Sequence, residues 1–332
     1  MKVADADRLR PGEQVEASGH GRRYASIVDA IGHTPLVEIA RMSPNPDVRL
    51  FAKLEFMNPT GSVKDRVAKY LIEDLERSGR LGPDSIILEP TRGNTGIALA
   101  MIARRKGYRL AVVLPENVTR ERRQLLTLFG AEIIESPGAL GSNGAVALAK
   151  ELVARNDRYV MPYQYGNPAN PQAHYETTAA EIIDDCPEVD VFVGGLGTGG
   201  TLMGIGKRLR EHNPQVRIFA AEPHPGDAVQ GLRSLEEGFI PEIFDPTILD
   251  GKLLVSNAES IDALRNLTEL EGIFAGVSSG GVLVAADRVA RTMENGTIVT
   301  LLPDGGWKYL SEDLWTRDVE EDREELESLN LW

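Results

Sequence analysis

The sequence predicts an α/β protein of two domains, each built on a mostly parallel, twisted sheet covered by helices. Three observations support this prediction. The chain has 332 residues, which is long for one domain and comfortable for two. Short β-branched runs alternate with amphipathic stretches of helical period, a pattern typical of parallel sheets with helices on both faces. Hydrophobic residues make up 42% and charged residues 26%, which fits a globular protein with a substantial core.

The expected elements follow one another in regular alternation. Each predicted strand is a short aliphatic or β-branched run between turn residues, and each predicted helix has apolar residues at helical spacing. The predicted strands are 49–55, 85–89, 110–114, 132–135, 189–194, 217–221 and 297–302. The predicted helices are 64–78, 95–106, 120–129, 144–154, 171–184, 200–212, 261–271 and 279–293. The stretch 161–171, rich in proline and glycine, is a plausible crossing between the domains.

Charge and composition argue against several classes of function. A formal net charge of −14 opposes general binding to nucleic acid or to an anionic membrane. The one cysteine, Cys186, excludes an internal disulfide framework and suits a reducing cytoplasm. The five histidines show no metal-ligand spacing, so we expect no structural metal. No apolar run approaches the length of a membrane span, and the N-terminus lacks the features of a secretory signal.

A glycine-rich loop joins the predicted strand 189–194 to the helix that follows it. Main-chain N–H groups at such a turn converge on one point, and the helix dipole adds positive potential, so the loop suits a phosphate. Its Gly195-x-Gly197-x-x-Gly200 pattern also matches a dinucleotide fingerprint, and Glu222 ends the next strand at about the expected interval of ~20 residues. A phosphate site, a nicotinamide site and a plain structural turn all remain open from this loop alone.

Two further loops carry hydroxyl groups at expected helix starts. Thr91 and Thr95 lie in the loop 91–96, where hydroxyls and amides suit a carboxylate, although capping by Asn94 or Thr95 explains the same residues. In the loop 271–281, helix capping accounts for one of Ser278 and Ser279, and the other is free to face a ligand.

Lys64 is expected in the first turn of a helix that Ser62 caps, directly after the turn sequence Asn-Pro-Thr-Gly. A cation is disfavoured there by the helix dipole, and burial would lower its pKa below the ordinary ~10.4. A neutral amine is what capture of an aldehyde requires. One such lysine, a phosphate-type loop and a serine able to meet a pyridine nitrogen together indicate a pyridoxal phosphate site.

These segments resemble the motifs of the cysteine synthase and cystathionine β-synthase family, and they occur in that family's order. The segments are Gly-His-Thr-Pro-Leu at 32–36, Asn-Pro-Thr-Gly-Ser-Val-Lys-Asp-Arg at 58–66, Gly-Asn-Thr-Gly at 93–96, Pro-Glu-Asn at 115–117, Gly-Thr-Gly-Gly-Thr at 197–201 and Gly-Val-Ser-Ser-Gly at 276–280. None is specific alone, but together they are, and the resemblance runs from about Tyr24 to Tyr309. It implies the tryptophan synthase β-like fold of fold-type II pyridoxal phosphate enzymes.

The resemblance assigns roles to individual residues. Lys64 would hold the cofactor as a Schiff base and later move the substrate's α-proton, Asn94 would hydrogen-bond the ring oxygen, and Ser278 would meet the pyridine nitrogen. The phosphate would be wrapped by Gly197, Thr198, Gly199, Gly200 and Thr201. The substrate carboxylate would be held by Thr91, Asn94, Thr95 and Gln164.

Within the family the segments 163–170, 237–241 and 306–310 and the Leu-Trp end of the chain resemble O-phosphoserine sulfhydrylases and B-type cysteine synthases. In that branch an arginine at the position of Arg233 binds the substrate phosphate, although acetylserine-using enzymes can carry it too. Arg92 departs from the family, which usually has serine there. It could supply a second cation, block the nucleophile's path or point outward.

The resemblance also implies domains and partners. Residues 24–58 and 160–316 would form the larger, cofactor-binding domain, and residues 59–159 the smaller domain that closes over substrate. Residues 1–23 would be an extension, and the acidic tail 317–332 would either fold over the site or form an exposed helix. A homodimer is expected.

The implied reaction is β-replacement on an activated serine through an aminoacrylate, with O-phosphoserine favoured and O-acetylserine possible. Sulfide or a thiocarboxylated carrier protein would supply sulfur. Alternatives are another nucleophile or a cystathionine-like product, a silent binding protein and, more distantly, an NAD-dependent oxidoreductase.

Overall fold

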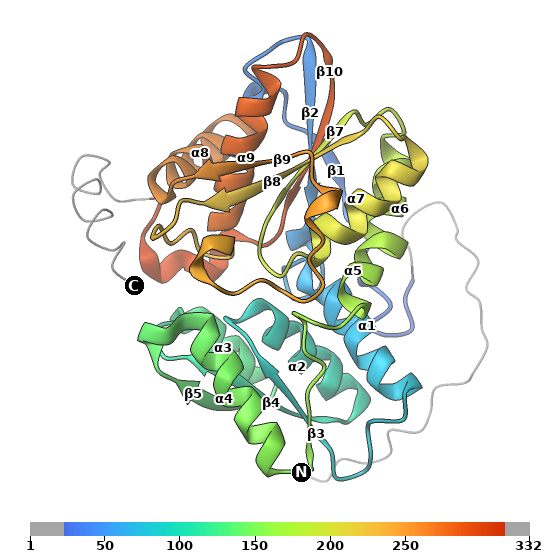
Figure 1. Cartoon of the computed structure of the whole chain (residues 1–332), viewed down its shortest axis with the longest axis vertical. Coiled ribbons are helices and arrows are strands. Elements are labelled where there is room, and N and C mark those ends of the chain that lie inside the picture. Colours follow the sequence, from blue (N-terminus) through green and yellow to red (C-terminus); the bar gives the residue numbers. More distant parts are fainter. Residues whose placement is uncertain (1–22, 316–332) are drawn as a thin grey trace.

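The computed structural model describes residues 23–315, which form two sheets with their helices stacked along the long axis of the molecule (Figure 1). The large sheet has six strands in the order β1-β2-β10-β7-β8-β9, and only the pair β1–β2 is antiparallel. Its strands are β1 (Leu36–Glu38), β2 (Val48–Leu54), β7 (Val191–Gly195), β8 (Arg217–Pro223), β9 (Gly251–Val255) and β10 (Gly296–Leu302).

The small sheet has four parallel strands in the order β5-β4-β3-β6. They are β3 (Ile86–Pro90), β4 (Arg109–Pro115), β5 (Glu132–Ser136) and β6 (Tyr159–Val160). The predicted α/β class with mostly parallel sheets is therefore confirmed. The strands of the small sheet all lie between residues 86 and 160, and the division into residues 59–159 and residues 24–58 with 160–316 stays a prediction.

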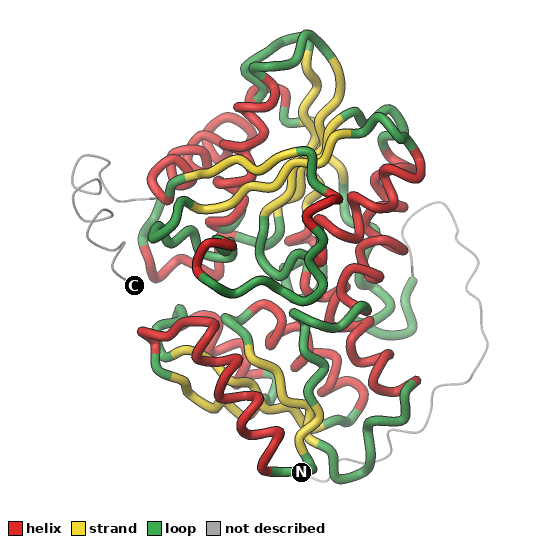
Figure 2. Tube along the Cα trace, viewed as in Figure 1, coloured by secondary structure: helices red, strands yellow, loops and turns green. Residues whose placement is uncertain are grey.

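Helices cover both faces of each sheet (Figure 2). On the large sheet, α8 (Asn257–Glu271) and α9 (Val277–Ala290) pack on one face, and α6 (Ala179–Asp185) and α7 (Gly200–His212) on the other. On the small sheet, α1 (Lys64–Arg77) and α2 (Asn94–Lys106) lie opposite α4 (Gly141–Arg155). The remaining helices are α3 (Arg120–Leu128) and α5 (Ala169–Ala173).

The continuous apolar runs in the strands follow from this two-sided cover. Successive side chains of a strand point to opposite faces, so a strand buried on both faces has no polar alternation. In β3, Ile87 packs towards α2 while Ile86 and Leu88 pack towards α4. In β10, Ile298 joins the α9 side and Val299 the α7 side.

All the predicted strands and helices occur, with shifts of a few residues at their ends. Three short strands, β1, β6 and β9, were not predicted from the sequence, and all three lie at sheet edges. One predicted helix was wrong in detail, because 171–184 is interrupted by a π-helical turn at His174–Thr178 between α5 and α6. The predicted extension 1–23 lies, except for Arg23, outside the described residues, as does the tail 317–332.

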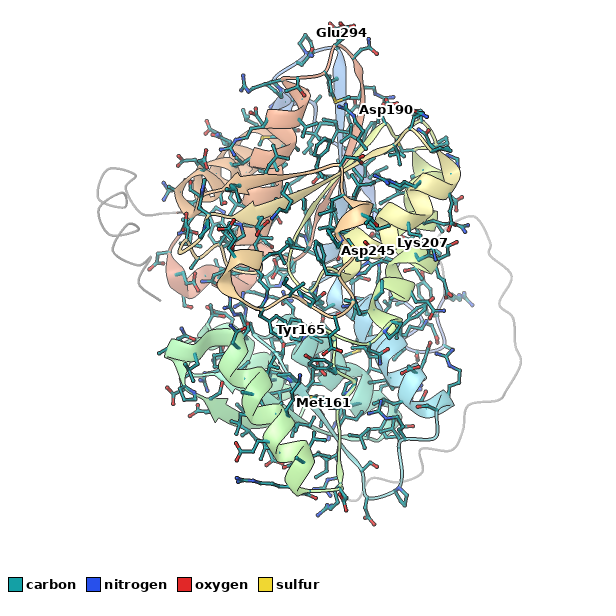
Figure 3. All side chains as sticks on the ribbon, in the orientation of Figure 1. Met161, Tyr165, Asp190, Lys207, Asp245 and Glu294 are labelled. Carbon is teal, nitrogen blue, oxygen red and sulfur yellow. The ribbon has the colours of Figure 1, made fainter. Side chains whose placement is uncertain are left out.

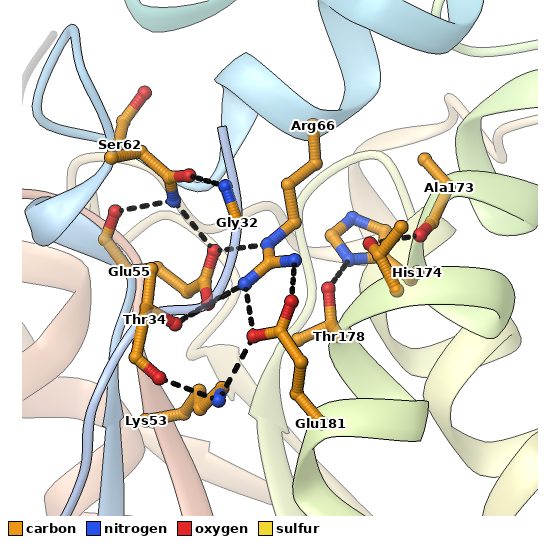
Figure 4. A network of polar contacts seen from close by, with 12 residues as sticks. Gly32, Thr34, Lys53, Glu55, Ser62, Arg66, Ala173, His174, Thr178 and Glu181 are labelled. Carbon is orange, nitrogen blue, oxygen red and sulfur yellow. Dashed lines mark hydrogen bonds and ion pairs between the residues drawn. The ribbon is translucent and has the colours of Figure 1, made fainter. Parts of the chain in front are cut away.

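A buried network of charges fastens the start of α1 to the large sheet (Figure 4). The Arg66 guanidinium donates to both carboxylate oxygens of Glu55 (2.8 and 2.9 Å) and of Glu181 (2.6 and 2.7 Å). Lys53 Nζ also pairs with Glu181 at 3.0 Å, and it donates to the Thr34 carbonyl at 2.7 Å. Because Arg66 stands two residues after Lys64, this network fixes the position of the lysine.

The network should make the protein sensitive to acid in a defined range. Burial by itself would raise the pKa of Glu181, but the Arg66 and Lys53 charges lower that pKa from 4.5 to about 2. The stabilisation is therefore complete above pH 4.5 and is lost as the pH falls towards 2. Between pH 5 and pH 3 we expect the unfolding free energy to fall by about 2 kcal/mol more in wild type than in Glu181→Gln. Urea unfolding at both pH values measures this difference. An equal fall in the unfolding free energy of wild type and Glu181→Gln would contradict the expectation.

Among residues 23–315 no helix is both long and apolar enough to cross a bilayer. Within the same range no cluster of three or more potential metal-ligating side chains is found.

Candidate active site

The functional loops meet where parallel strands end. β2 leads into the turn before Lys64, β3 into the loop 91–93, β7 into the glycine loop, and β10 into Pro303 and Asp304. Carboxyl ends of strands in open α/β sheets are the usual location of ligand sites. Here the ends of strands from the two sheets face the same region between them (Figure 1). The topology therefore brings the predicted motifs together.

Lys64 is the first residue of α1, and its main-chain N–H donates to Ser62 Oγ at 3.3 Å. The predicted capping of this helix by Ser62 is wrong, because the N-cap is Val63 and no side chain caps the helix; Ser62 instead stabilises the turn just before it. The lysine side chain is half-buried, and its Nζ makes no hydrogen bond with any described residue. Loss of solvation lowers the pKa of Lys64, and this effect outweighs the opposing charges of Asp304 and Glu55. The result is an amine that is more readily neutral than an ordinary lysine.

Asn94 is held between a buried cation and a buried anion. Its Oδ1 accepts from Lys308 Nζ at 2.8 Å, and its Nδ2 donates to Asp304 Oδ2 at 2.7 Å. Lys308 also donates to the Gly61 carbonyl at 3.2 Å, which ties Asn94 to the turn before Lys64. Capping of α2 by Asn94 or Thr95 is wrong, because the helix has no side-chain cap and Asn94 is its first residue.

The glycine loop lies at the start of α7, where Gly199 adopts a left-handed φ of +88° that favours glycine. Thr198 Oγ1 accepts from the Gly200 N–H at 3.4 Å and from Asn170 Nδ2 at 3.0 Å. A Cβ at Gly200 would collide with the Asn170 side chain. Glycine at position 200 therefore allows Asn170 to lie close against the loop. Asn170 Oδ1 is buried and has no hydrogen-bond partner among the described residues.

The far end of the loop rests on a buried histidine. Thr201 Oγ1 lies 3.2 Å from His174 Nε2, and His174 Nδ1 lies 3.1 Å from Thr178 Oγ1. Burial, aided by the Lys64 and Arg66 charges, keeps the pKa of His174 well below its usual range. The imidazole is therefore neutral at physiological pH.

Ser278 lies beside the glycine loop. A Cβ on Gly231 would lie 3.1 Å from Ser278 Oγ, and a Cβ on Gly197 would lie 3.0 Å from the Gly231 carbonyl oxygen. Ser278 is buried, and its hydroxyl makes no hydrogen bond with the described part of the chain. Capping by Ser278 or Ser279 is wrong, since both lie inside α9, whose N-cap is Gly276 and lacks a side-chain cap.

Three of the predicted carboxylate-binding residues, Thr91, Thr95 and Gln164, make hydrogen bonds around the start of α2. Thr95 Oγ1 donates to Gln164 Oε1 at 2.7 Å, and Thr91 Oγ1 accepts from the main-chain N–H groups of Gly93 and Gly96. Glu89 fixes the other side of Gln164 by accepting its main-chain N–H at 2.9 Å. Burial raises the pKa of Glu89 to about 8, although hydrogen bonds from the 163–164 main chain oppose the shift.

The two arginines both reach the first turn of α4. Arg233 Nη1 donates to Asn143 Oδ1 at 3.0 Å, and its guanidinium lies 4.5 Å from the Phe239 ring centroid and 5.5 Å from that of Tyr165. Tyr165 lies at the boundary between the two halves of the molecule (Figure 3). Arg92 is exposed, with Nη2 3.1 Å from the position of a Cβ on Gly141. It therefore extends from its loop towards α4.

The assembled groups fit one cofactor. Pyridoxal phosphate offers an aldehyde, a phosphate, a ring nitrogen and a ring oxygen. The site offers an available amine on Lys64, main-chain N–H groups at a glycine-rich loop, the available hydroxyl of Ser278 and the amide of Asn94. Residues 27–304 match the family described as "Pyridoxal-phosphate dependent enzyme".

The chain belongs to this family. The enzyme is 40% identical to a cysteine synthase from Staphylococcus aureus over 303 residues, which cover 88% of this chain and 97% of that protein. The structure of O-ureido-L-serine synthase superposes with a TM-score of 0.83 at 39% identity, covering 89% of this chain and 96% of the other. A cysteine synthase from Entamoeba histolytica gives a TM-score of 0.85 at 34% identity, covering 95% and 98%. The enzyme is thus pyridoxal phosphate-dependent and of cysteine synthase type.

Glu222, the acid that suggested a nicotinamide site, binds other groups of the protein. Glu222 is fully buried, its Oε1 accepts the Leu235 N–H at 2.7 Å, and its Oε2 pairs with Lys252 at 2.7 Å. Its carboxylate is therefore not presented to a ribose, and the family match favours the pyridoxal phosphate prediction over the dinucleotide one.

Sequence reasoning missed four polar residues that support the site: Asn170, His174, Asp304 and Lys308. Lys308 lies within the segment 306–310 that carried part of the family resemblance, so its presence was visible although its contact with Asn94 was not.

Proposed function

We propose that the enzyme catalyses a cysteine synthase-type β-replacement on an activated serine, with O-phosphoserine favoured over O-acetylserine. The observation that carries this proposal is the environment of Lys64, whose amine has a lowered pKa and no protein hydrogen-bond partner within the described residues. An amine in that state can bind the cofactor's aldehyde and can later take a proton from the substrate's α-carbon.

The cofactor, when bound, supplies an electron sink for the charge that develops at the α-carbon. Lys64 holds and moves the proton at that atom. Ser278 would meet the ring nitrogen with a neutral hydroxyl, which would leave the ring unprotonated and favour loss of the β-substituent over transamination. Thr91, Asn94, Thr95 and Gln164 hold the substrate carboxylate near the start of α2, where the helix dipole favours an anion.

Arg233 and Arg92 support the choice of a phosphorylated substrate. Both guanidinium groups reach the first turn of α4, at Asn143 and Gly141 respectively. Arginine binds phosphate through paired, charge-assisted hydrogen bonds, which an uncharged acetyl group cannot match. The Arg233 main chain is also fixed beside the glycine loop, because its N–H donates to the Leu196 carbonyl at 2.8 Å.

Replacing Arg233 with alanine should lower kcat/KM for O-phosphoserine by about tenfold to a hundredfold, the value of a hydrogen bond to a charged group. Turnover of O-acetylserine should change much less, since it lacks the phosphate charge. Steady-state assays of cysteine formation from each substrate with sulfide measure both effects. Mass analysis of the products detects any other β-substituted product.

Arg217→Ala is the matched control, because Arg217 also lies over an aromatic ring, that of Phe219, but on an exposed strand end. Arg92→Ser should lower O-phosphoserine turnover by a smaller factor. Unchanged O-phosphoserine turnover in Arg233→Ala would disprove the phosphate assignment, and unchanged rate and preference in Arg92→Ser would remove Arg92 from the site.

Other features of the proposal rest on the family resemblance. They are a homodimer, a cytoplasmic location and either sulfide or a thiocarboxylated carrier protein as the sulfur donor. The alternative product class, from another nucleophile or a cystathionine-like reaction, is supported by the likeness to O-ureido-L-serine synthase.

A further inference from the structure

A cation and an anion, both fully buried, lie directly behind Asn94. We propose that Lys308 and Asp304 are positioning residues that lock the Asn94 side-chain amide in one orientation, so that one N–H is fixed towards the cofactor's ring oxygen. This inference rests on the pyridoxal phosphate site and on the role of Asn94 given above. Neither Lys308 nor Asp304 is among the residues that the family resemblance assigned to the site.

The chemistry of the two neighbours permits only one orientation of the amide. An ammonium group can only donate hydrogen bonds, and an ionised carboxylate can only accept them. Lys308 Nζ therefore requires the amide oxygen of Asn94 (2.8 Å), and Asp304 Oδ2 requires the amide nitrogen (2.7 Å). A flipped amide would oppose donor to donor and acceptor to acceptor inside the protein, which is costly. The second N–H of Asn94 is thereby held in a fixed direction.

The segment that carries both charges is itself firmly held. Asp304 Oδ2 accepts a second hydrogen bond from the Tyr309 hydroxyl at 2.9 Å, and the Asp304 carbonyl accepts the Gly276 N–H at 2.8 Å. The Lys308 carbonyl accepts from Thr119 Oγ1 at 3.0 Å. Residues 303–309 thus link Asn94 to the start of α9, which carries Ser278.

The same segment contacts the turn that leads to Lys64. The Val63 N–H donates to the Pro303 carbonyl at 2.8 Å, and Ser62 and Asp304 form an isolated β-bridge. Lys308 Nζ reaches the Gly61 carbonyl at 3.2 Å. One segment therefore sets the relative positions of the amine, the amide and the serine that the cofactor needs.

The buried cation also strengthens the donor. A charge one hydrogen bond behind an amide oxygen polarises the amide and makes its N–H groups more acidic. Burial lowers the pKa of Lys308 to about 8, with Asp304 and Asp65 opposing the shift and Arg122 and Lys64 adding to it. The ammonium form therefore predominates at neutral pH.

The test measures cofactor binding and the cofactor's absorbance, without any substrate. In Lys308→Met we expect affinity for pyridoxal phosphate to fall about tenfold and the absorbance band of the bound cofactor to shift. Lys308→Arg, which retains a buried cation, should stay within about threefold of wild type and keep the wild-type spectrum. Lys106→Met is the control, because Lys106 pairs with Glu76 away from the site and its loss should change neither quantity.

A double-mutant cycle separates positioning from general support of the fold. If Lys308 acts through Asn94, then Asn94→Ala with Lys308→Met should bind the cofactor no more weakly than Asn94→Ala alone. The proposal would be overturned if the losses of cofactor affinity in the two single variants multiplied in the double variant. It would also be overturned if the Lys308→Met holoenzyme had the affinity and spectrum of wild type. Should Lys308→Met not fold, Asp304→Ala, which removes the acceptor for Asn94 Nδ2, replaces it in the same cycle with the same expectation. A failure to use O-phosphoserine would leave these results untouched, so the two proposals can fail separately.

Discussion

Replacing Lys64 with alanine should reduce turnover of activated serine by about a thousandfold or more while the protein still folds. The lysine supplies the amine for the cofactor and the base for the α-proton, and a positioned base alone contributes about 10²–10⁴ in rate. The half-buried side chain makes no hydrogen bond to a described residue, so its loss leaves no buried partner unsatisfied. Single-turnover and steady-state rates of the reconstituted variant measure the effect, and circular dichroism checks the fold.

Lys69→Ala is the matched control, because Lys69 lies on the same helix and is also half-buried. It should retain nearly full activity. Activity of Lys64→Ala within tenfold of wild type would show that another group does the work assigned to this amine.

The largest loss of stability should come from Arg66→Met. The side chain of Arg66 is 1% exposed, and its guanidinium makes charge-assisted hydrogen bonds to Glu55 and Glu181. Its removal leaves Glu55, also fully buried, without its cation, and breaking such a pair from one side costs about 3–5 kcal/mol. Urea unfolding of the two proteins at pH 7 measures the difference in unfolding free energy.

Arg77→Met provides the comparison from the other end of α1. Arg77 is 69% exposed and lies 3.6 Å from Asp74, an exposed pair of the kind worth at most about 0.5 kcal/mol. Equal destabilisation by the two substitutions would contradict the view that the buried network holds the start of α1.

The fold was largely predictable because both faces of each sheet are buried. That burial makes the strands apolar throughout, and the helices between them carry clear helical spacing. The elements that were not predicted are short or locally irregular. Strand β6 has only two residues, and its pairing with β3 depends on contacts outside its own sequence. The π-helical turn at His174–Thr178 likewise has no signal in the helical pattern around it.

The site was predictable only where residues lie beside a turn. The glycine loop and Thr91 follow strands directly, and Lys64 follows the turn that comes after β2, so local chemistry and motif resemblance indicate them. Lys308 could not be found in this way, because its partner Asn94 lies 214 residues earlier in the chain. Its role depends on the fold that joins the end of β10 to the start of α2.

The proposed chemistry requires Lys64 to form the covalent link to the cofactor. Reduction of the holoenzyme with borohydride, followed by mass mapping of its peptides, tests this claim most directly. We expect the yellow protein to bleach and a single pyridoxyl phosphate label to be found on Lys64. A label on another lysine, such as the buried Lys308, or a bleached protein with no label on Lys64, would contradict it.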